Sequence, residues 1–247
     1  MTTSIYLLIK VFDKEEYADA FMQKGEMFCR TLGDFKKIDE TDGRGDKFEA
    51  VTDWHQSELT KLTITYKDKD GVEKSFPIEK ISGPVTIQNN AYDRINLYSM
   101  YAVKAPEWDE SYETEDERIV IIQKINAMLK ESKTLSNEVI SLGEFAVVVY
   151  QVEDFIARVK KAAQEKNFAC WNKLIEYYDP DTFHGSFEEL ESIFRKRNMY
   201  AHQNEYRFAF ASQEPEGTRL IHLGSLDEIA IKVPTREINE KVQLKLL

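Results

Sequence analysis

Short runs of apolar and β-branched residues, separated by polar turns, constrain the fold of this chain more than any other feature. Residues 5–12, 95–103 and 144–150 are such runs, and each has the length and composition of a buried β-strand. Residues 153–166 instead carry apolar side chains at helical spacing, with lysines on the opposite side. Strands and helices do not alternate regularly, so the pattern predicts an α+β fold with a mixed, mainly antiparallel sheet and flanking helices.

Turn and cap signals divide the rest of the chain. Residues 60–66 and 72–81 have extended patterns, and the Asp-Gly pair between them predicts a β-hairpin. The polar, glycine-bearing stretch 34–46 predicts an exposed loop. A Ser-x-x-Glu capping box predicts a helix over 186–195, and apolar spacing predicts another over 116–130.

Composition limits the classes of function. The 247 residues suit a single domain, with 104–117 as the best candidate boundary. The formal charge of -11 disfavours broad duplex-DNA binding and binding to an anionic membrane surface. The run 5–12 is too short to span a bilayer and lacks the features of a signal peptide. Two cysteines, Cys29 and Cys170, form no disulfide framework, which favours reduced thiols and a cytoplasmic location. The four histidines lack paired ligand spacing, so no metal site is predicted.

Residues 203–211 carry the pattern that is most informative about function. As a strand, this segment places Gln203, Glu205 and Arg207 on one face and aromatic residues on the other. The aromatic face belongs in a core. If the strand is central, the charged face needs partners or a ligand, because a buried unpaired charge is costly. On an exposed sheet face, the same charges would pair with neighbours and contribute little to stability.

The first half of the chain supplies possible partners for that face. Arg30 lies at the end of the strand predicted over 26–32, and a guanidinium there could bind a phosphate with two hydrogen bonds. Tyr98 or Tyr101 could stack on a planar ring. The ordinary alternatives are a surface arginine and a pair of core tyrosines.

Several segments resemble an uncharacterised family of bacterial and phage proteins. They are GEMFCRTLGDFK and GRGDKFE within residues 25–49, QNEYRF at 203–208, and LGSLDEIA at 223–230. The resemblance spans most of the chain in short islands, and it implies no particular chemistry.

A second resemblance is to ADP-ribosyltransferases. Many of these enzymes carry an arginine or histidine on an early strand, a Ser-Thr-Ser or tyrosine strand next, and Gln/Glu-x-Glu on a late strand. The string Gln-Asn-Glu at 203–205 is similar to the last element, and Arg30 and Ser99 match the first two in order. The middle element departs from the family pattern, because residues 98–100 read Tyr-Ser-Met.

This second resemblance implies an ADP-ribosyltransferase-like enzyme or an NAD-binding protein. A role in phage–bacterium conflict is expected for such a protein and equally for a non-enzymatic inhibitor. Glu205 would stabilise the positive charge that develops on the ribose, and Ser99 would support Glu205 by hydrogen bonding. Gln203 would orient the acceptor, and Arg30 would hold the pyrophosphate. The resemblance further implies that a nucleotide-type ligand contacts Tyr98, Tyr101 and Arg207.

Two other interpretations remain open at this point. The acidic run 107–117, with Trp108 and Tyr112, is typical of a non-enzymatic protein that binds a basic protein partner. A nuclease-like site with Mg²⁺ would use the carboxylates of Asp46, Glu49 and Glu205.

Overall fold

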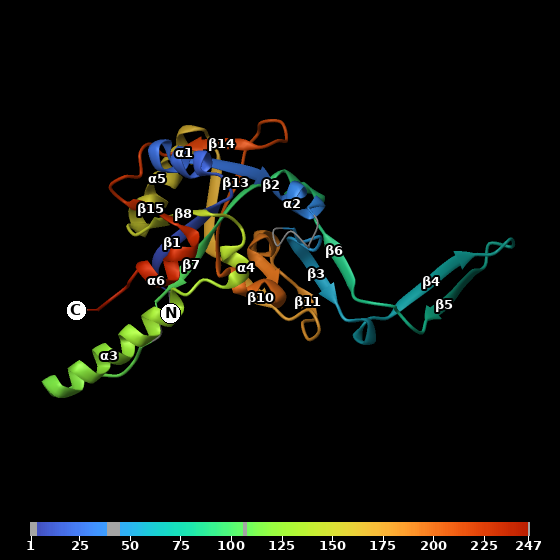
Figure 1. Ribbon diagram of the computed structural model, residues 1–247. Helices are drawn as coiled ribbons and strands as arrows, with labels where there is room; N and C mark the ends of the chain where they lie inside the picture. The colour runs from blue at the N-terminus through green and yellow to red at the C-terminus, as the bar shows by residue number, and fades with distance from the viewer. Residues whose placement is uncertain (1–3, 39–44, 106–107, 247) are drawn as a thin grey trace.

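The computed structural model describes residues 4–38, 45–105 and 108–246, and its largest element is an eight-stranded antiparallel sheet (Figure 1). Six strands follow one another in the order β14 (Arg219–His222), β2 (Glu26–Thr31), β7 (Asn96–Lys104), β1 (Ile5–Phe12), β8 (Phe145–Val149) and β15 (Ala230–Pro234). The other two are β13 (Glu205–Ala211), which pairs with β7, and β9 (Ala169–Leu174), which pairs with β13.

Helices cover both faces of this sheet. On one face, α1 (Glu15–Lys24) and α5 (Val152–Glu165) bury Phe21 and Phe155 against Phe208 of β13. On the other face, the short helices α4 (Asn137–Ile140) and α6 (Ile238–Lys241) pack on β1, β7 and β8. Helix α1 ends at Gly25, whose φ of 59° is in the left-handed region that glycine tolerates best.

Two smaller sheets lie beside the end of β13. The first joins β3 (Val51–His55), β6 (Val85–Gln88) and β11 (Gly185–Ser186). The second pairs β10 (Glu176–Tyr178) with β12 (Arg195–Arg197) in parallel. Trp54 and Tyr178 join the two through a ring contact of 5.9 Å between centroids. Together these strands place β12 next to the charged face of β13.

Two elements extend away from this body (Figure 1). One is the hairpin of β4 (Leu62–Lys67) and β5 (Glu73–Ile78), in which every residue of the two strands is exposed and Tyr66 stacks on Phe76. The other is helix α3 (Glu115–Ser132). The remaining described helices are α2 (Leu32–Lys37) and the 3₁₀ helices η2 (Ser57–Leu59), η3 (Asn90–Arg94), η4 (Glu189–Phe194), η5 (Asn198–Gln203) and η6 (Thr235–Glu237).

The predicted fold class is confirmed: the chain is α+β, with mainly antiparallel sheets and flanking helices, and this arrangement is consistent with one domain. The predicted hairpin and the strands near 5–12, 95–103 and 144–150 are also confirmed. Among the described residues, no helix is both long enough and apolar enough to cross a membrane.

Two local predictions were wrong. The stretch 186–195 is not an α-helix, because the Ser186 hydroxyl donates to Asp53 on the neighbouring strand, at 2.5 Å, instead of capping a helix. Its residues form the end of β11, then η4, then the start of β12. The predicted loop 34–46 begins inside α2, which Thr31 and Asp34 cap reciprocally, while residues 39–44 lie outside the described part of the chain.

Candidate functional site

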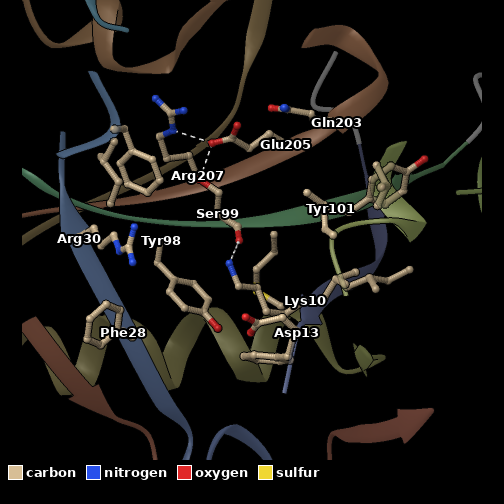
Figure 2. Close-up of a pocket in the computed structure, with 18 of the residues that line it drawn as sticks. Lys10, Asp13, Phe28, Arg30, Tyr98, Ser99, Tyr101, Gln203, Glu205 and Arg207 are labelled. Carbon is tan, nitrogen blue, oxygen red and sulfur yellow. Dashed lines mark hydrogen bonds and ion pairs between the residues drawn. The ribbon is translucent and has the colours of Figure 1, made fainter. Parts of the chain in front are cut away.

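The site is built where the central strand β7 changes partner. On one edge, β2 pairs with Asn96 and Leu97, and β1 pairs with β7 from Tyr101 onward. In the described structure no strand pairs with residues 98–100 on that edge, whereas β13 follows the other edge throughout. A cavity of about 580 Å³ is lined by this part of β7 and by β1, β2 and β13 (Figure 2). Its volume is in the range of small-molecule sites.

All of the residues predicted for the site line this one cavity. Arg30 comes from β2, Ser99 from β7 and Glu205 from β13, three segments that are far apart in the sequence (Figure 2). The other predicted residues in the lining are Tyr98, Tyr101, Gln203 and Arg207.

Glu205 is a buried carboxylate that accepts three side-chain hydrogen bonds. Oε1 accepts from the Ser99 hydroxyl and from Arg207 Nε at 2.7 Å, and Oε2 accepts from Lys196 Nζ at 3.0 Å. Burial by itself would raise the pKa of Glu205, but the charges of Arg207 and Lys196 outweigh it and lower that pKa well below its ordinary value. Glu205 is therefore ionised at neutral pH and acts as a negative charge rather than as a proton donor.

A second carboxylate completes a ring of alternating charges. Arg207 Nη1 donates to Glu49 Oε1 at 2.6 Å, and Lys196 Nζ lies 3.8 Å from Glu49 Oε2. The side chains of Glu49, Lys196, Glu205 and Arg207 are each 6% exposed or less. Two cations thus balance two carboxylates out of contact with bulk water. Of the two alternatives for the charged face of β13, a buried face and an exposed one, the structure shows the buried face.

Gln203 reaches the cavity by a different route from the one predicted. It ends η5 instead of lying on a strand, and Asn204, with a φ of 40°, turns the chain before β13 begins at Glu205. The two side chains nevertheless meet, because Lys196 Nζ donates to Gln203 Oε1 at 2.9 Å as well as to Glu205. The predicted strand over 203–211 therefore starts two residues late, but its aromatic face is buried as expected.

The two tyrosines of β7 belong to the walls of the cavity. Tyr98 stacks on Phe21, with 6.0 Å between ring centroids, and Lys10 Nζ lies 4.4 Å from the Tyr98 centroid. These contacts leave Tyr98 only 3% exposed, so little of its ring is available to a ligand. Tyr101 is also buried, and its hydroxyl accepts a hydrogen bond from Asn204 Nδ2 at 3.2 Å.

The wall formed by β2 and the start of α1 is open and carries charge. Arg30 is exposed, and no carboxylate of the described residues forms an ion pair with it. Phe28 and Tyr17 expose 54% and 46% of their surface in the same lining. Five basic and four acidic residues line the cavity, in a chain whose net charge is -11. The lining thus has an excess of one positive charge, and the unpaired guanidinium of Arg30 favours an anionic ligand.

Two residues of the site were missed from the sequence. Lys10 is the one charged residue in the apolar run 5–12. Its Nζ donates to the Ser99 carbonyl at 2.8 Å, a hydrogen bond that a neighbouring strand would otherwise supply. A lone lysine in a run of apolar residues was a signal from which a polar contact of this kind could have been predicted. Lys196 directly follows the helix predicted over 186–195, and no strand was predicted there. In β12, strand alternation turns its side chain away from those of Arg195 and Arg197.

The other predicted features lie elsewhere. Within the run 107–117, residue 107 is outside the described structure, Trp108 is half-buried and Tyr112 is exposed. The end of the run forms the first turn of α3, with Thr114 as its cap.

Of the carboxylates considered for a nuclease, Asp46 pairs with Arg197, at 2.6 Å, and does not line the cavity. Among the described residues, no group of three or more His, Cys, Asp or Glu side chains is arranged to hold a metal ion.

Comparison of the chain with models of protein families, with curated protein sequences and with solved structures finds no match.

Proposed function

We propose that the cavity binds NAD and that the protein transfers ADP-ribose from it, with Glu205 as the catalytic carboxylate. The observation that carries the proposal is the convergence of Arg30, Ser99 and Glu205 on one cavity, with the Ser99 hydroxyl donating to Glu205. Chance matches to a three-part pattern would not be expected to meet in space. The resemblance to ADP-ribosyltransferases implies this contact.

The charges of the lining suit a dinucleotide. Its pyrophosphate carries two negative charges, and the exposed guanidinium of Arg30 can bind such a group with two hydrogen bonds. The exposed ring of Phe28 lies in the same wall and offers a surface for a planar base. Glu205 lies on β13, on the other side of β7 from these two residues.

The chemistry requires a negative charge beside the ribose. The bond between ribose C1 and the nicotinamide nitrogen breaks, and its electron pair leaves with neutral nicotinamide. A new bond forms from the oxygen or nitrogen of the acceptor to C1, and the acceptor loses a proton to solvent. Positive charge develops on the ribose in between, and an ionised carboxylate stabilises that charge.

The environment of Glu205 supports this role over that of an acid or a base. Its lowered pKa keeps it ionised, so it neither donates a proton nor accepts one readily at neutral pH. Only 5% of its side chain is exposed, so a substrate contacts it through one small group, such as a ribose hydroxyl.

The proposal is tested by measuring NAD binding by calorimetry and nicotinamide release by chromatography. We expect wild-type protein to bind NAD and release nicotinamide, with water as the default acceptor. Glu205→Gln keeps the shape of the side chain and removes its charge, so we expect turnover to fall by about 10²–10³-fold while binding is retained.

The matched control is Glu153→Gln, which makes the same chemical change on the exposed first turn of α5. This variant should retain full turnover. Absence of any NAD binding by the wild-type protein would refute the proposal, as would a Glu205→Gln variant as active as the wild type.

A second candidate function rests on α3, which extends from the body with acidic residues in its first turn (Figure 1). Ile119 and Val120 are nearly half exposed just beyond that turn. Such a surface suits a partner with basic and apolar groups. If α3 binds a basic protein, replacing Glu115, Asp116 and Glu117 with glutamine should abolish co-purification of that basic protein and leave NAD binding intact.

A further inference from the structure

We propose that Lys196 is a positioning residue that aligns Glu205 with Gln203, a role that rests on the proposed function of the cavity. Nothing in the sequence pattern of ADP-ribosyltransferases set out above includes a lysine at this place. The assignment comes from the contacts of one buried ammonium group.

In the described part of the chain, Lys196 hydrogen-bonds both members of the Gln-x-Glu string. Its Nζ donates to Gln203 Oε1 at 2.9 Å and to Glu205 Oε2 at 3.0 Å. A lysine ammonium is only a donor, so it also fixes which end of the Gln203 amide faces it: the oxygen. Through Lys196, the short strand β12 thereby sets the separation and orientation of the Gln203 and Glu205 side chains.

This alignment is needed because β13 does not supply it. Gln203 and Glu205 would share a face automatically on a continuous strand, but the left-handed backbone of Asn204 breaks the alternation between them. Lys196 restores their proximity from a different element, β12, which pairs with β10 instead of with β13.

The neighbours of Lys196 have other partners. Arg195 pairs with Glu176, and Arg197 pairs with Asp46. Neither carboxylate lines the cavity. Of these three consecutive basic residues, only the middle one lines the cavity, where it contacts Glu205 and Glu49.

The groups that face Glu205 are few, so the effect of losing Lys196 can be stated. Oε1 keeps Ser99 and Arg207, whereas Oε2 loses its side-chain donor. The charge ring changes from balanced to one excess negative charge, because Glu49 and Glu205 then share Arg207 alone. Glu205 becomes easier to protonate, and Gln203 loses its hydrogen bond to Lys196.

The test uses Lys196→Met in the full chain, with Lys173→Met as the matched control. Lys173 also contacts two carboxylates, Glu176 and Glu191, but it is 41% exposed and lies outside the cavity lining. We expect Lys196→Met to lower kcat for nicotinamide release by about 100-fold, because misalignment at a reacting centre has effects of this size, and to change KM far less. The control should retain both constants.

A second measurement does not depend on turnover. Carbon-13 NMR of the carboxyl groups, with the Glu205 signal assigned from Glu205→Gln, should show that Glu205 titrates at higher pH in Lys196→Met than in the wild type. If Lys196→Met does not fold, Lys196→Gln takes its place, since it keeps hydrogen-bonding capacity and removes the charge.

The two measurements separate the two proposals. If the wild type releases no nicotinamide, the proposed function fails, and the NMR titration alone decides the role of Lys196. An unchanged kcat in an active protein, or an unchanged Glu205 titration in a folded variant, would overturn the assignment of Lys196.

Discussion

Replacing Arg207 with methionine should destabilise the protein strongly at neutral pH and much less at acidic pH. Among the described residues, Arg207 is the largest side chain that is fully buried, and it links the carboxylates of Glu49 and Glu205. Methionine fills much of the same volume without charge. The variant therefore tests whether the buried ring is an electrostatic unit or only a packed one.

The expected magnitude follows from what loses a partner. Arg207 donates to Glu205 at 2.7 Å, to Glu49 at 2.6 Å and to the carbonyl of Ile193 at 2.5 Å. Removal leaves two buried carboxylates sharing Lys196, and breaking a buried charge pair in this way costs about 3–5 kcal/mol. That is a large part of the total stability of a typical domain, about 5–15 kcal/mol.

The sign of the pH dependence follows from Glu205. Its pKa is lowered on folding, so in the wild type it contributes stability that is present above its unfolded pKa and is lost as the pH falls through its folded pKa. Without Arg207 the effect of burial dominates, and the pKa of Glu205 rises. The folded variant then binds a proton more tightly than its unfolded chain, so its stability falls as the pH rises.

Urea unfolding followed by tryptophan fluorescence measures both effects at a series of pH values. Lys232→Met is the control: it removes a lysine that also contacts two carboxylates, Glu15 and Asp19, but on the surface, and it should cost less than about 1 kcal/mol. A loss for Arg207→Met as small as the control, or one that does not change with pH, would refute the electrostatic interpretation.

Three further predictions concern single residues. Tyr98→Phe should raise the free energy of unfolding by up to about 1 kcal/mol, because the buried hydroxyl has no hydrogen-bond partner among the described residues; urea unfolding measures this, and a clear loss of stability would contradict it. Gly143→Ala should cost about 1–3 kcal/mol, since a Cβ there would overlap the Phe12 carbonyl oxygen. A neutral result in the same assay would contradict it. Burial raises the pKa of the Cys29 thiol strongly and that of the Cys170 thiol to about 11. A maleimide should therefore label Cys170 slowly and Cys29 only after unfolding, and rapid labelling of Cys29 in the folded protein would contradict this prediction.

Local periodicity was enough to predict the strands that carry the site. The alternation over 203–211 predicted that Glu205 and Arg207 share a face opposite the buried aromatics, and the direct bond between them confirms it. The apolar runs at 5–12 and 95–103 likewise predicted two strands of the large sheet. These features are local because successive side chains of a strand point to opposite faces of the sheet.

The features that were missed depend on contacts between distant segments. Ser186 and Glu189 have the spacing of a helix cap, but strand pairing with β3 recruits Ser186 instead, and tertiary contacts override the local preference. The break at Asn204 and the reach of Lys196 likewise follow from three-dimensional packing. No periodicity encodes the change of partner along β7 that opens the cavity.

The exposure of the β4–β5 hairpin makes it thermodynamically separable from the rest of the molecule. Its residues bury little surface, so its backbone hydrogen bonds can open without loss of the main sheet, and its amide protons should exchange with solvent far faster than those of β7. Substitutions, insertions or a shortened turn in this arm should leave the melting temperature and the cavity unchanged, because no residue of the hairpin lines the cavity. The arm can therefore vary during evolution, or be trimmed in the laboratory, independently of the chemistry in the body.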